Sequence, residues 1–462
     1  MNRAFNAVQM TALLVALAAT ALAADDPDTL LRKMSEFNAV QIVYREGVPH
    51  TDSRGRLLTQ YDPERSFFQI AIWGNPYGTA YGYDYDLKVL TDSGFNTMWP
   101  WPSRSLEDQL ETGLKSGLQV VTMQKHDLGA VAAFKDHPAW LGNCWHDEPT
   151  GGFWGKDMEG KFAEFLAYKA KMNELVPGVP VFINDVPWVT PPATSWWVKW
   201  NTSGDVACHD NYPLLDRKRR ARTLGTDPPS TGISETVSLA VAANEERKPV
   251  WFIVGAFTSQ ERGAFPFRMA TPVQLRAQVY AALIHGATGI IYFCWDTYVC
   301  RDGKVIGMSP DPRVAYLEAG PGKPKASPAK PMQLAQSKAL WMAATQINSE
   351  IRELTPSLLS PTAPASVRYG VTFKGEPVTS DPLRCILKPH PEGGFVLLTV
   401  NLDDAVLDAT YRFEDGLAMA APLFENREAL QLSEDSLEFS DVYEPFDVHV
   451  YRIMPRRPEG GQ

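Results

Sequence analysis

The sequence predicts an α/β fold: a (β/α)8 TIM barrel followed by a small antiparallel β-sandwich domain. Two patterns carry this prediction. Between Phe67 and Leu354, short apolar β-rich runs alternate with amphipathic stretches, which is typical of parallel strands whose two faces are both buried. After residue 364 the runs are short, β-rich and separated by turn residues, which favours an antiparallel sandwich.

The amino-terminal residues 1–23 are expected to form a secretory signal peptide. Arg3 precedes an apolar run from Met10 to Leu22, and the small-residue tripeptide Ala21-Leu22-Ala23 resembles a cleavage site. We therefore expect a mature protein that is secreted or periplasmic. No cysteine lies at the cleavage point, so no lipid anchor is expected, and no later run is long and apolar enough to span a bilayer.

The composition narrows the class of partner. The net charge is -10 and the pI is about 5.4, which argues against a nucleic-acid partner. Five cysteines are too few to build a disulfide scaffold of this size. Cys294 and Cys300 flank one expected loop and could pair, whereas Cys144, Cys208 and Cys294 lie in apolar runs, where buried thiols are expected. The chain has 13 Trp, 16 Tyr and 21 Phe, enough for a core and for stacking against sugar rings.

Residues 24–66 should lead into the barrel as a helix over Thr29–Phe37 and a hairpin over 41–60 that turns near Asp52 to Gly55. The barrel itself is expected over 67–355. Its eight strands are predicted at Phe67–Trp73, Phe95–Trp101, Leu118–Met123, Trp140–Trp145, Val179–Ile183, Asp205–Cys208, Val250–Val254 and Gly289–Trp295.

Helix signals lie between these runs. Ser105 is a predicted N-cap with an acid three residues later, and Thr271 to Gln274 form a capping box with proline at the first helical position. A helix is also predicted within 156–175, and one over 331–354 closes the eighth repeat. The Gly-, Pro- and Lys-rich stretch 302–330 is expected to be a loop inserted after strand eight.

The second domain is expected over 365–454, with its boundary in Pro356–Pro364 and a disordered tail over 455–462. Its strands are predicted at Ser366–Phe373, Leu383–Leu387, Phe395–Asn401, Thr410–Phe413 and Val448–Ile453.

Strand four ends in two adjacent carboxylates, Asp147 and Glu148, followed by Pro149. Neighbouring strand residues point to opposite faces, so one acid should face a cavity and the other should brace a loop or strand. A carboxyl beside Trp140 and Trp145 is in surroundings that raise a pKa and suit a general acid. The alternative is a helix cap followed by surface acids.

The active site of such a barrel lies at the carboxyl ends of its strands, where this sequence repeatedly places aromatic rings and acids. Flat rings and carboxylate acceptors suit a carbohydrate. Asp185 could instead orient a loop through Asn184, Asp210 could brace the Tyr212-Pro213 turn, and Lys125 could pair with Asp147 or be solvated. The expected substrate-binding residues are Trp73, Asn75, Trp99, Trp101, Lys125, Asp147, Asp185, Trp188, Tyr212 and Trp295.

Three strand ends resemble the barrel glycoside hydrolases of the large retaining clan that includes β-galactosidases: Asp147-Glu148-Pro149, Asp210-Asn211-Tyr212-Pro213 and Tyr292-Phe293-Cys294-Trp295-Asp296. The terminal run 448–453 is similar to the last strand of the β-domain that often follows such barrels. The resemblance implies an O-glycosyl hydrolase with no cofactor, and it maps the general acid onto Glu148. The family's usual residue before this acid is asparagine, whereas this chain has Asp147.

The family's second catalytic carboxylate, a glutamate at the end of strand seven, has no counterpart. The run 251–257 ends without an acid, and Glu261 follows only in the loop. Glu261 could fold back as nucleophile, or Asp210 or Asp296 could activate a water. Retention needs carboxyls about 5 to 5.5 Å apart and inversion about 6.5 to 9.5 Å, so the stereochemistry stays open.

Two rival functions remain. The missing acid on strand seven is also what an inactive, glycan-binding barrel would show. A metal-dependent hydrolase has little support, because His137, His146, His209 and His285 lack the spacing of metal ligands. The chain also lacks a Gly-x-Ser-x-Gly elbow and a phosphate-binding glycine-rich loop.

Overall fold

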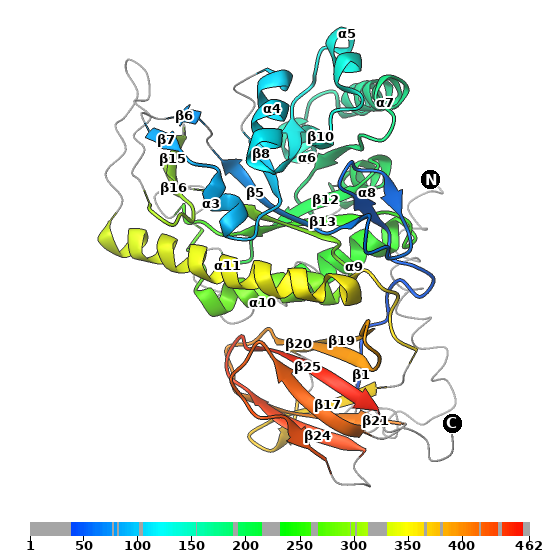
Figure 1. Ribbon diagram of the computed structural model, residues 1–462, viewed down its shortest axis with the longest axis vertical. Helices are drawn as coiled ribbons and strands as arrows, with labels where there is room; N and C mark the ends of the chain where they lie inside the picture. The colour runs from blue at the N-terminus through cyan, green and yellow to red at the C-terminus, as the bar shows by residue number, and fades with distance from the viewer. Residues whose placement is uncertain are drawn as a thin grey trace.

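The computed structural model contains a closed barrel of eight parallel strands and, below it in Figure 1, a β-sandwich. The strand order around the barrel follows the chain and closes β14 onto β5. The predicted fold is therefore confirmed. The structure describes residues 38–75, 78–80, 83–100, 105–153, 155–187, 193–214, 232–259, 267–295, 297–300, 303–312, 330–364, 367–378, 382–414, 417–432 and 437–455.

All eight predicted runs form barrel strands, because each is apolar enough to be buried on both faces. The strands are β5 (Gln69–Asn75), β8 (Thr97–Pro100), β9 (Gln119–Met123), β10 (Trp140–Asp147), β11 (Val181–Asn184), β12 (Ala207–Asn211), β13 (Val250–Gly255) and β14 (Gly289–Phe293).

A helix follows each barrel strand, and the predicted caps are present. The Ser105 side chain accepts a hydrogen bond from the amide of Asp108, and Thr271 and Gln274 form the reciprocal capping box. The helices are α3 (Lys88–Asp92), α4 (Leu106–Ser116), α5 (Leu128–Val131), α6 (Pro149–Phe153), α7 (Met158–Leu175), α8 (Ala193–Ser203), α9 (Ile233–Ala243), α10 (Pro272–Ile284) and α11 (Pro331–Leu358), with a 3-10 turn at Ala132–Phe134.

Two hairpins stand beside the barrel strands. The first pairs β6 (Gly78–Ala80) with β7 (Tyr83–Tyr85), after β5. The second pairs β15 (Thr297–Cys300) with β16 (Gly303–Ile306), after β14. The stretch 302–330 that was expected to be a loop therefore includes a strand. Ile306 returns to bridge Thr258 beyond the end of β13, so this hairpin is fastened to the barrel rim.

The amino-terminal segment serves both domains. The predicted hairpin is present as β2 (His50–Asp52) paired with β3 (Leu57–Leu58) and β4 (Ser66–Phe67), and its turn is closed by a bond from Gly55 N to Asp52 O. The preceding strand β1 (Asn38–Ala39) pairs with β17 of the sandwich, as Figure 1 shows. The sequence does not predict this pairing.

The sandwich consists of two antiparallel sheets around a separate apolar core. All five predicted strands are present, although several short partner strands were not predicted. One sheet contains β1, β17 (Val367–Phe373), β18 (Glu376–Pro377), β21 (Leu407–Phe413) and β24 (Glu438–Tyr443). The other contains β19 (Leu383–Pro389), β20 (Phe395–Asn401), β22 (Leu417–Leu423), β23 (Leu430–Gln431) and β25 (Val448–Pro455).

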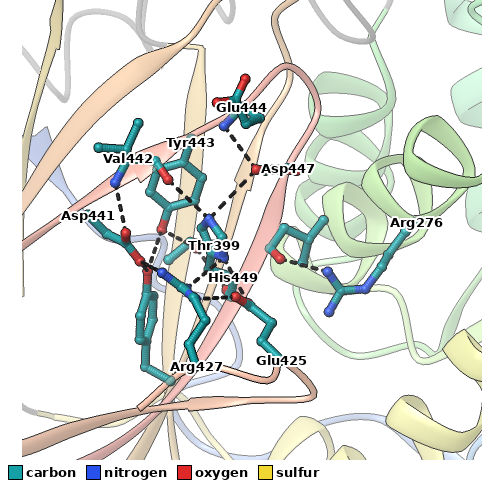
Figure 2. A network of polar contacts seen from close by, with 12 residues as sticks. Arg276, Thr399, Glu425, Arg427, Asp441, Val442, Tyr443, Glu444, Asp447 and His449 are labelled. Atoms are coloured by element: carbon teal, nitrogen blue, oxygen red, sulfur yellow. Dashed lines mark hydrogen bonds and ion pairs between the residues drawn. The ribbon is translucent and has the colours of Figure 1, made fainter. Parts of the chain in front are cut away.

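Helices α10 and α11 lie between the barrel and the sandwich (Figure 1), and one apolar core runs through both. Arg276 of α10 reaches across this junction (Figure 2). Its Nε donates to Oε2 of Glu350 on α11 at 2.9 Å. Its Nη1 donates to the carbonyl of Val448 on β25 at 2.6 Å. The junction is therefore both apolar and ionic.

Several sequence predictions lie outside the described residues: the signal peptide, the helix over 29–37 and residues 456–462 of the tail. Within the ranges that the structure describes, no helix combines the length and apolar character needed to cross a bilayer. Cys144 and Cys208 are buried, as predicted.

Candidate active site

The chain leaves strand β10 at Glu148, whose φ is +50°. This left-handed conformation is uncommon for a residue other than glycine and is found preferentially at functional sites. It is held by two backbone hydrogen bonds: Glu148 N donates to Asn184 O at 2.8 Å, and Gly152 N donates to Glu148 O at 2.9 Å. Strand alternation therefore ends at Asp147, and both acids are exposed.

Asp147 and Asp210 converge on one amide. Asn184, at the end of β11, donates through Nδ2 to Oδ1 of Asp147 at 2.9 Å and to Oδ1 of Asp210 at 2.8 Å. The two carboxyl oxygens are therefore closer than the sum of these distances, which is below the about 6.5 Å minimum for an inverting pair. The two aspartates thus form one unit with no room between them for an attacking water.

The two carboxyls of this unit differ in their contact with solvent. Asp147 is exposed at the barrel mouth, whereas Asp210 is 1% exposed. Surrounding protein raises the pKa of Asp147 to about 6, against the lowering effect of the bond from Asn184. Burial, reinforced by the charge of Asp147, raises the pKa of Asp210 to about 7. Because Asp147 is open to solvent and Asp210 is not, solvation favours the negative charge of the pair on Asp147.

Asp185 is buried beneath helix α6. Its Oδ1 accepts from the amide of Thr150 at 3.2 Å, and its Oδ2 accepts from the Thr150 hydroxyl at 2.5 Å. Burial raises the pKa of Asp185 well above its usual value, and the charges of Glu148 and Asp147 contribute in the same direction. These contacts match the expectation that Asp185 orients a loop. Sugar binding by Asp185 stays a prediction.

The ring of Tyr212 packs over the end of strand β13. The last residue of β13 is Gly255, and a Cβ built on it would be 2.9 Å from Cδ1 of Tyr212. The tyrosine ring therefore fills the space that a longer side chain would need. Burial raises the pKa of Tyr212 well above its usual value, and the charges of Asp210, Glu148 and Asp147 add to this.

Aromatic rings line the rim beside Tyr212. Its ring packs against Phe257 at 5.1 Å, Phe267 at 5.7 Å and Phe293 at 5.9 Å between centroids. Phe267 and Phe293 are partly exposed. Carboxylates on β10 to β12 thus face apolar rings on β12 to β14, an arrangement that suits the mixed polar and apolar surface of a sugar.

Three of the predicted tryptophans are buried. Trp73 and Trp99 pack against each other inside the barrel, with ring centroids 5.0 Å apart, and are 2% and 0% exposed. Trp295 packs against Trp341 of α11 at 6.1 Å on the helix side. Their placement makes them packing residues, and none offers an open face at the mouth. Lys125 is exposed and pairs with Glu164 of α7 at 2.7 Å.

Four predicted site residues lie outside the described residues: Trp101, Trp188, Glu261 and Asp296. The backbone of Asn75 ends β5, and its side chain is not described. Sequence reasoning noted Asn184 only as a loop brace and did not identify Gly255. Asn184 could have been recognised from its position, because it is the last residue of a strand lying between two strands that end in acids.

A second group of ionisable side chains lies in the sandwich (Figure 2). Arg427 contacts Glu425 and Asp441, each at 2.6 Å, and Nδ1 of His449 at 2.9 Å; the Tyr451 hydroxyl donates to Asp441 at 2.5 Å. Asp441 and Tyr451 belong to different sheets. These groups satisfy one another, so the cluster fastens the sandwich and the barrel mouth remains the candidate site.

Within the described part of the chain, no three His, Cys, Asp or Glu side chains are grouped so as to hold a metal ion. The carboxylates of the mouth are instead hydrogen-bonded to Asn184 and Thr150. The chemistry that this arrangement offers is proton transfer and stabilisation of positive charge by carboxyl groups.

Comparison with known proteins places glycoside hydrolases among the structural neighbours. A GH42 β-galactosidase from G. stearothermophilus matches with a TM-score of 0.51 and 9% identity, over 84% of this chain and 98% of that one. An Anoxybacillus α-amylase matches with a TM-score of 0.50 and 10% identity over the same shares. A β-galactosidase from Marinomonas ef1 matches with a TM-score of 0.42 and 14% identity. This match covers 62% of this chain and 60% of the Marinomonas protein.

No family model matches the sequence, and no curated protein matches it either. The resemblance that the strand-end motifs predict is confirmed at the level of the fold, because identities this low establish fold alone.

Proposed function

We propose that the protein is an exported glycoside hydrolase that cleaves O-glycosidic bonds of a poly- or oligosaccharide at the carboxyl end of its barrel. The observation that carries the proposal is the convergence of Asp147 and Asp210 on Asn184, beside Glu148 at the end of strand β10. Perturbed acids gathered at the carboxyl ends of barrel strands are the usual mark of an active site.

Glu148 is the proposed general acid. It is exposed at the mouth, and two hydrogen bonds fix its backbone in the left-handed region. Its charge is one of those that raise the pKa of Tyr212. In this role Glu148 protonates the glycosidic oxygen as the C–O bond breaks, the leaving sugar departs as an alcohol, and Glu148 later recovers a proton from the attacking water.

Asp147 is the proposed second carboxyl. It is exposed, so solvation favours the negative charge of the Asp147–Asp210 unit on this carboxyl. A carboxylate in this position stabilises the positive charge that develops at the anomeric carbon. Asp210 is too deeply buried to contact a sugar, so its role is to share protons with Asp147. This assignment supplies the carboxylate that β13 lacks.

The test is release of reducing ends from a panel of polysaccharides and aryl glycosides. Wild-type protein should hydrolyse at least one substrate, and Glu148→Gln should lower kcat about 10²- to 10⁴-fold, since general acid catalysis contributes that much. Glu164→Gln is the matched control, because Glu164 is a half-buried acid of helix α7 that pairs with Lys125 and Lys161. Full activity in Glu148→Gln would remove Glu148 from the mechanism.

A catalytically inactive glycan-binding barrel is the second candidate. It is favoured by one observation, the Tyr212 ring that occupies the space above Gly255 where the family's nucleophile would lie. Isothermal titration against the same panel separates the two functions. Tight glycan binding without release of reducing ends from any substrate would support the binding protein and contradict the hydrolase.

Export is supported by the signal-like pattern over residues 1–23. Cell fractionation followed by amino-terminal sequencing tests it. A processed chain in the periplasm or medium that begins next to Ala24 is expected, and a full-length chain retained in the cytoplasm would contradict export.

A further inference from the structure

We propose that Asn184 is the positioning residue of this site: it holds Asp147, Glu148 and Asp210 as one unit through its side-chain amide and its backbone carbonyl. The inference rests on the proposed function, because it assigns how the proposed catalytic carboxyls are arranged. Asn184 acts through these acids, so it is not itself a catalytic residue.

Asn184 contacts all three acids at once. Its Nδ2 donates to Asp147 and to Asp210, and its backbone carbonyl accepts from the amide of Glu148. The residue is 1% exposed and ends strand β11, whose neighbours on either side are β10 and β12. A rigid strand end therefore fixes acids that come from two different strands.

The side-chain amide has only one favourable orientation. Its two N–H groups meet two carboxylate oxygens, and its Oδ1 accepts from the thiol of Cys208 at 3.7 Å. A reversed amide would place its oxygen against Asp147 and Asp210 and leave both without a donor. Burial raises the pKa of Cys208 well above its usual value, so this thiol stays protonated and remains a donor.

The other groups around the pair are acidic or neutral. Glu148 adds negative charge, whereas burial raises the pKa of Asp185, Tyr212, Cys144 and Cys208 and favours the neutral form of each. Ionising both Asp147 and Asp210 would therefore add a second charge to an already negative mouth. Asn184 favours the ionised form of each carboxyl by donating to both, and solvent access then selects Asp147 as the charged one.

The experiment follows the side-chain carboxyl ¹³C resonances of aspartate against pH in wild type, Asn184→Asp and Asn184→Ser, with Asp147→Asn and Asp210→Asn for assignment. Asn184→Asp and Asn184→Ser both remove the bridging amide. The serine variant is used for the titration if the aspartate variant does not fold. Because the bond from Asn184 lowers both pKa values, Asn184→Ser should raise the pKa of each carboxyl by about half a unit or more.

The control is Asn201→Ser. Asn201 is equally buried on α8 and contacts only the backbone carbonyl of Cys208 and the side chain of Asn244. Its replacement should leave both titrations unchanged. Titrations in Asn184→Ser that match those of wild type, or an equal shift in Asn201→Ser, would overturn the inference.

Kinetics give the second readout. Asn184→Ser should lower kcat about 10²-fold with little change in KM and move the acid limb of the pH profile upward, since misplaced catalytic groups cost about this much. A rise in KM alone would contradict the positioning role. The NMR titration needs no substrate, so absence of glycan hydrolysis by wild type would refute the proposed function and leave the titration result to stand or fall separately.

Discussion

Asp147 and Asp210 have the same side chain but differ in their access to water. Burial leaves Asp210 with the higher pKa, about 7 against about 6 for Asp147. The two carboxyls share one donor, so they titrate as a pair, and access to water favours the charge on Asp147. If Asp147 must be ionised for catalysis, kcat/KM should fall as the pH drops below about 6.

Asp210 is expected to reduce stability at neutral pH. Its folded pKa is raised above the unfolded value, so the native state holds a proton that the unfolded chain loses, and stability falls as the pH rises from about 4 through about 7. Asp210→Asn should therefore raise the free energy of unfolding at pH 8, by roughly 1 to 3 kcal/mol, and have little effect at pH 4. Urea unfolding at the two pH values measures this.

Asp408→Asn is the control for that substitution, because Asp408 is exposed on strand β21. Its effect should be similar at both pH values. Equal effects of Asp210→Asn at pH 4 and pH 8 would contradict the raised pKa.

The sequence predicts some residues of the site and misses others. Asp147, Glu148 and Asp210 follow from their positions at strand ends, because the barrel brings those ends together. Asn184 and Gly255 are short residues whose importance depends on what lies beside them across the sheet. The burial of Trp73 and Trp99 depends on which face of the strand each side chain occupies, and that of Trp295 depends on how the chain leaves β14. Strand propensity alone reveals neither.

At the scale of the elements, helix α6 depends on Asp185. Thr150→Val keeps the shape of the side chain but removes the hydroxyl donor to Asp185. It should lower the free energy of unfolding by about 1 to 3 kcal/mol, because a buried carboxyl oxygen loses its partner, and speed amide exchange in α6. Thermal unfolding and hydrogen exchange measure the two effects.

Thr345→Val on α11 is the matched control, since the Thr345 hydroxyl bonds only within its own helix and the residue is partly exposed. It should change the stability by less than about 0.5 kcal/mol. If Asp185 bound the substrate instead of bracing α6, the Thr150→Val protein would keep its stability and show a raised KM.

Most elements could be predicted because their signals are local. The barrel strands are continuous apolar runs, and α4 and α10 begin at capping residues. Strands β1, β18, β22, β23 and β24 were not predicted. Each pairs with a strand distant in sequence or is only two residues long, so its strand conformation comes from the sheet it joins more than from its own residues.

At the scale of the whole molecule, the Arg276–Glu350 pair joins the barrel helices to the sandwich. Glu350 is 3% exposed and also accepts from the Tyr280 hydroxyl at 2.8 Å. Arg276→Met leaves this buried carboxylate without its cation and removes the bond to Val448. It should therefore lower the free energy of unfolding by about 3 to 5 kcal/mol, measured by calorimetry.

Arg247→Met provides the comparison, because Arg247 pairs with Glu245 where both side chains are more than 70% exposed. Exposed pairs contribute about 0 to 1 kcal/mol. Equal losses in the two variants would show that the junction is held by its apolar contacts alone.

In the proposed mechanism Asp147 faces the anomeric carbon of a bound sugar. Azide rescue of Asp147→Ala with an activated aryl glycoside is the measurement that separates this role from a structural one. The variant should lose at least about 10³-fold in hydrolysis, and azide should restore turnover by entering the space of the missing carboxylate and leaving as a glycosyl azide. Hydrolysis by Asp147→Ala at the wild-type rate, with no glycosyl azide formed, would contradict the account.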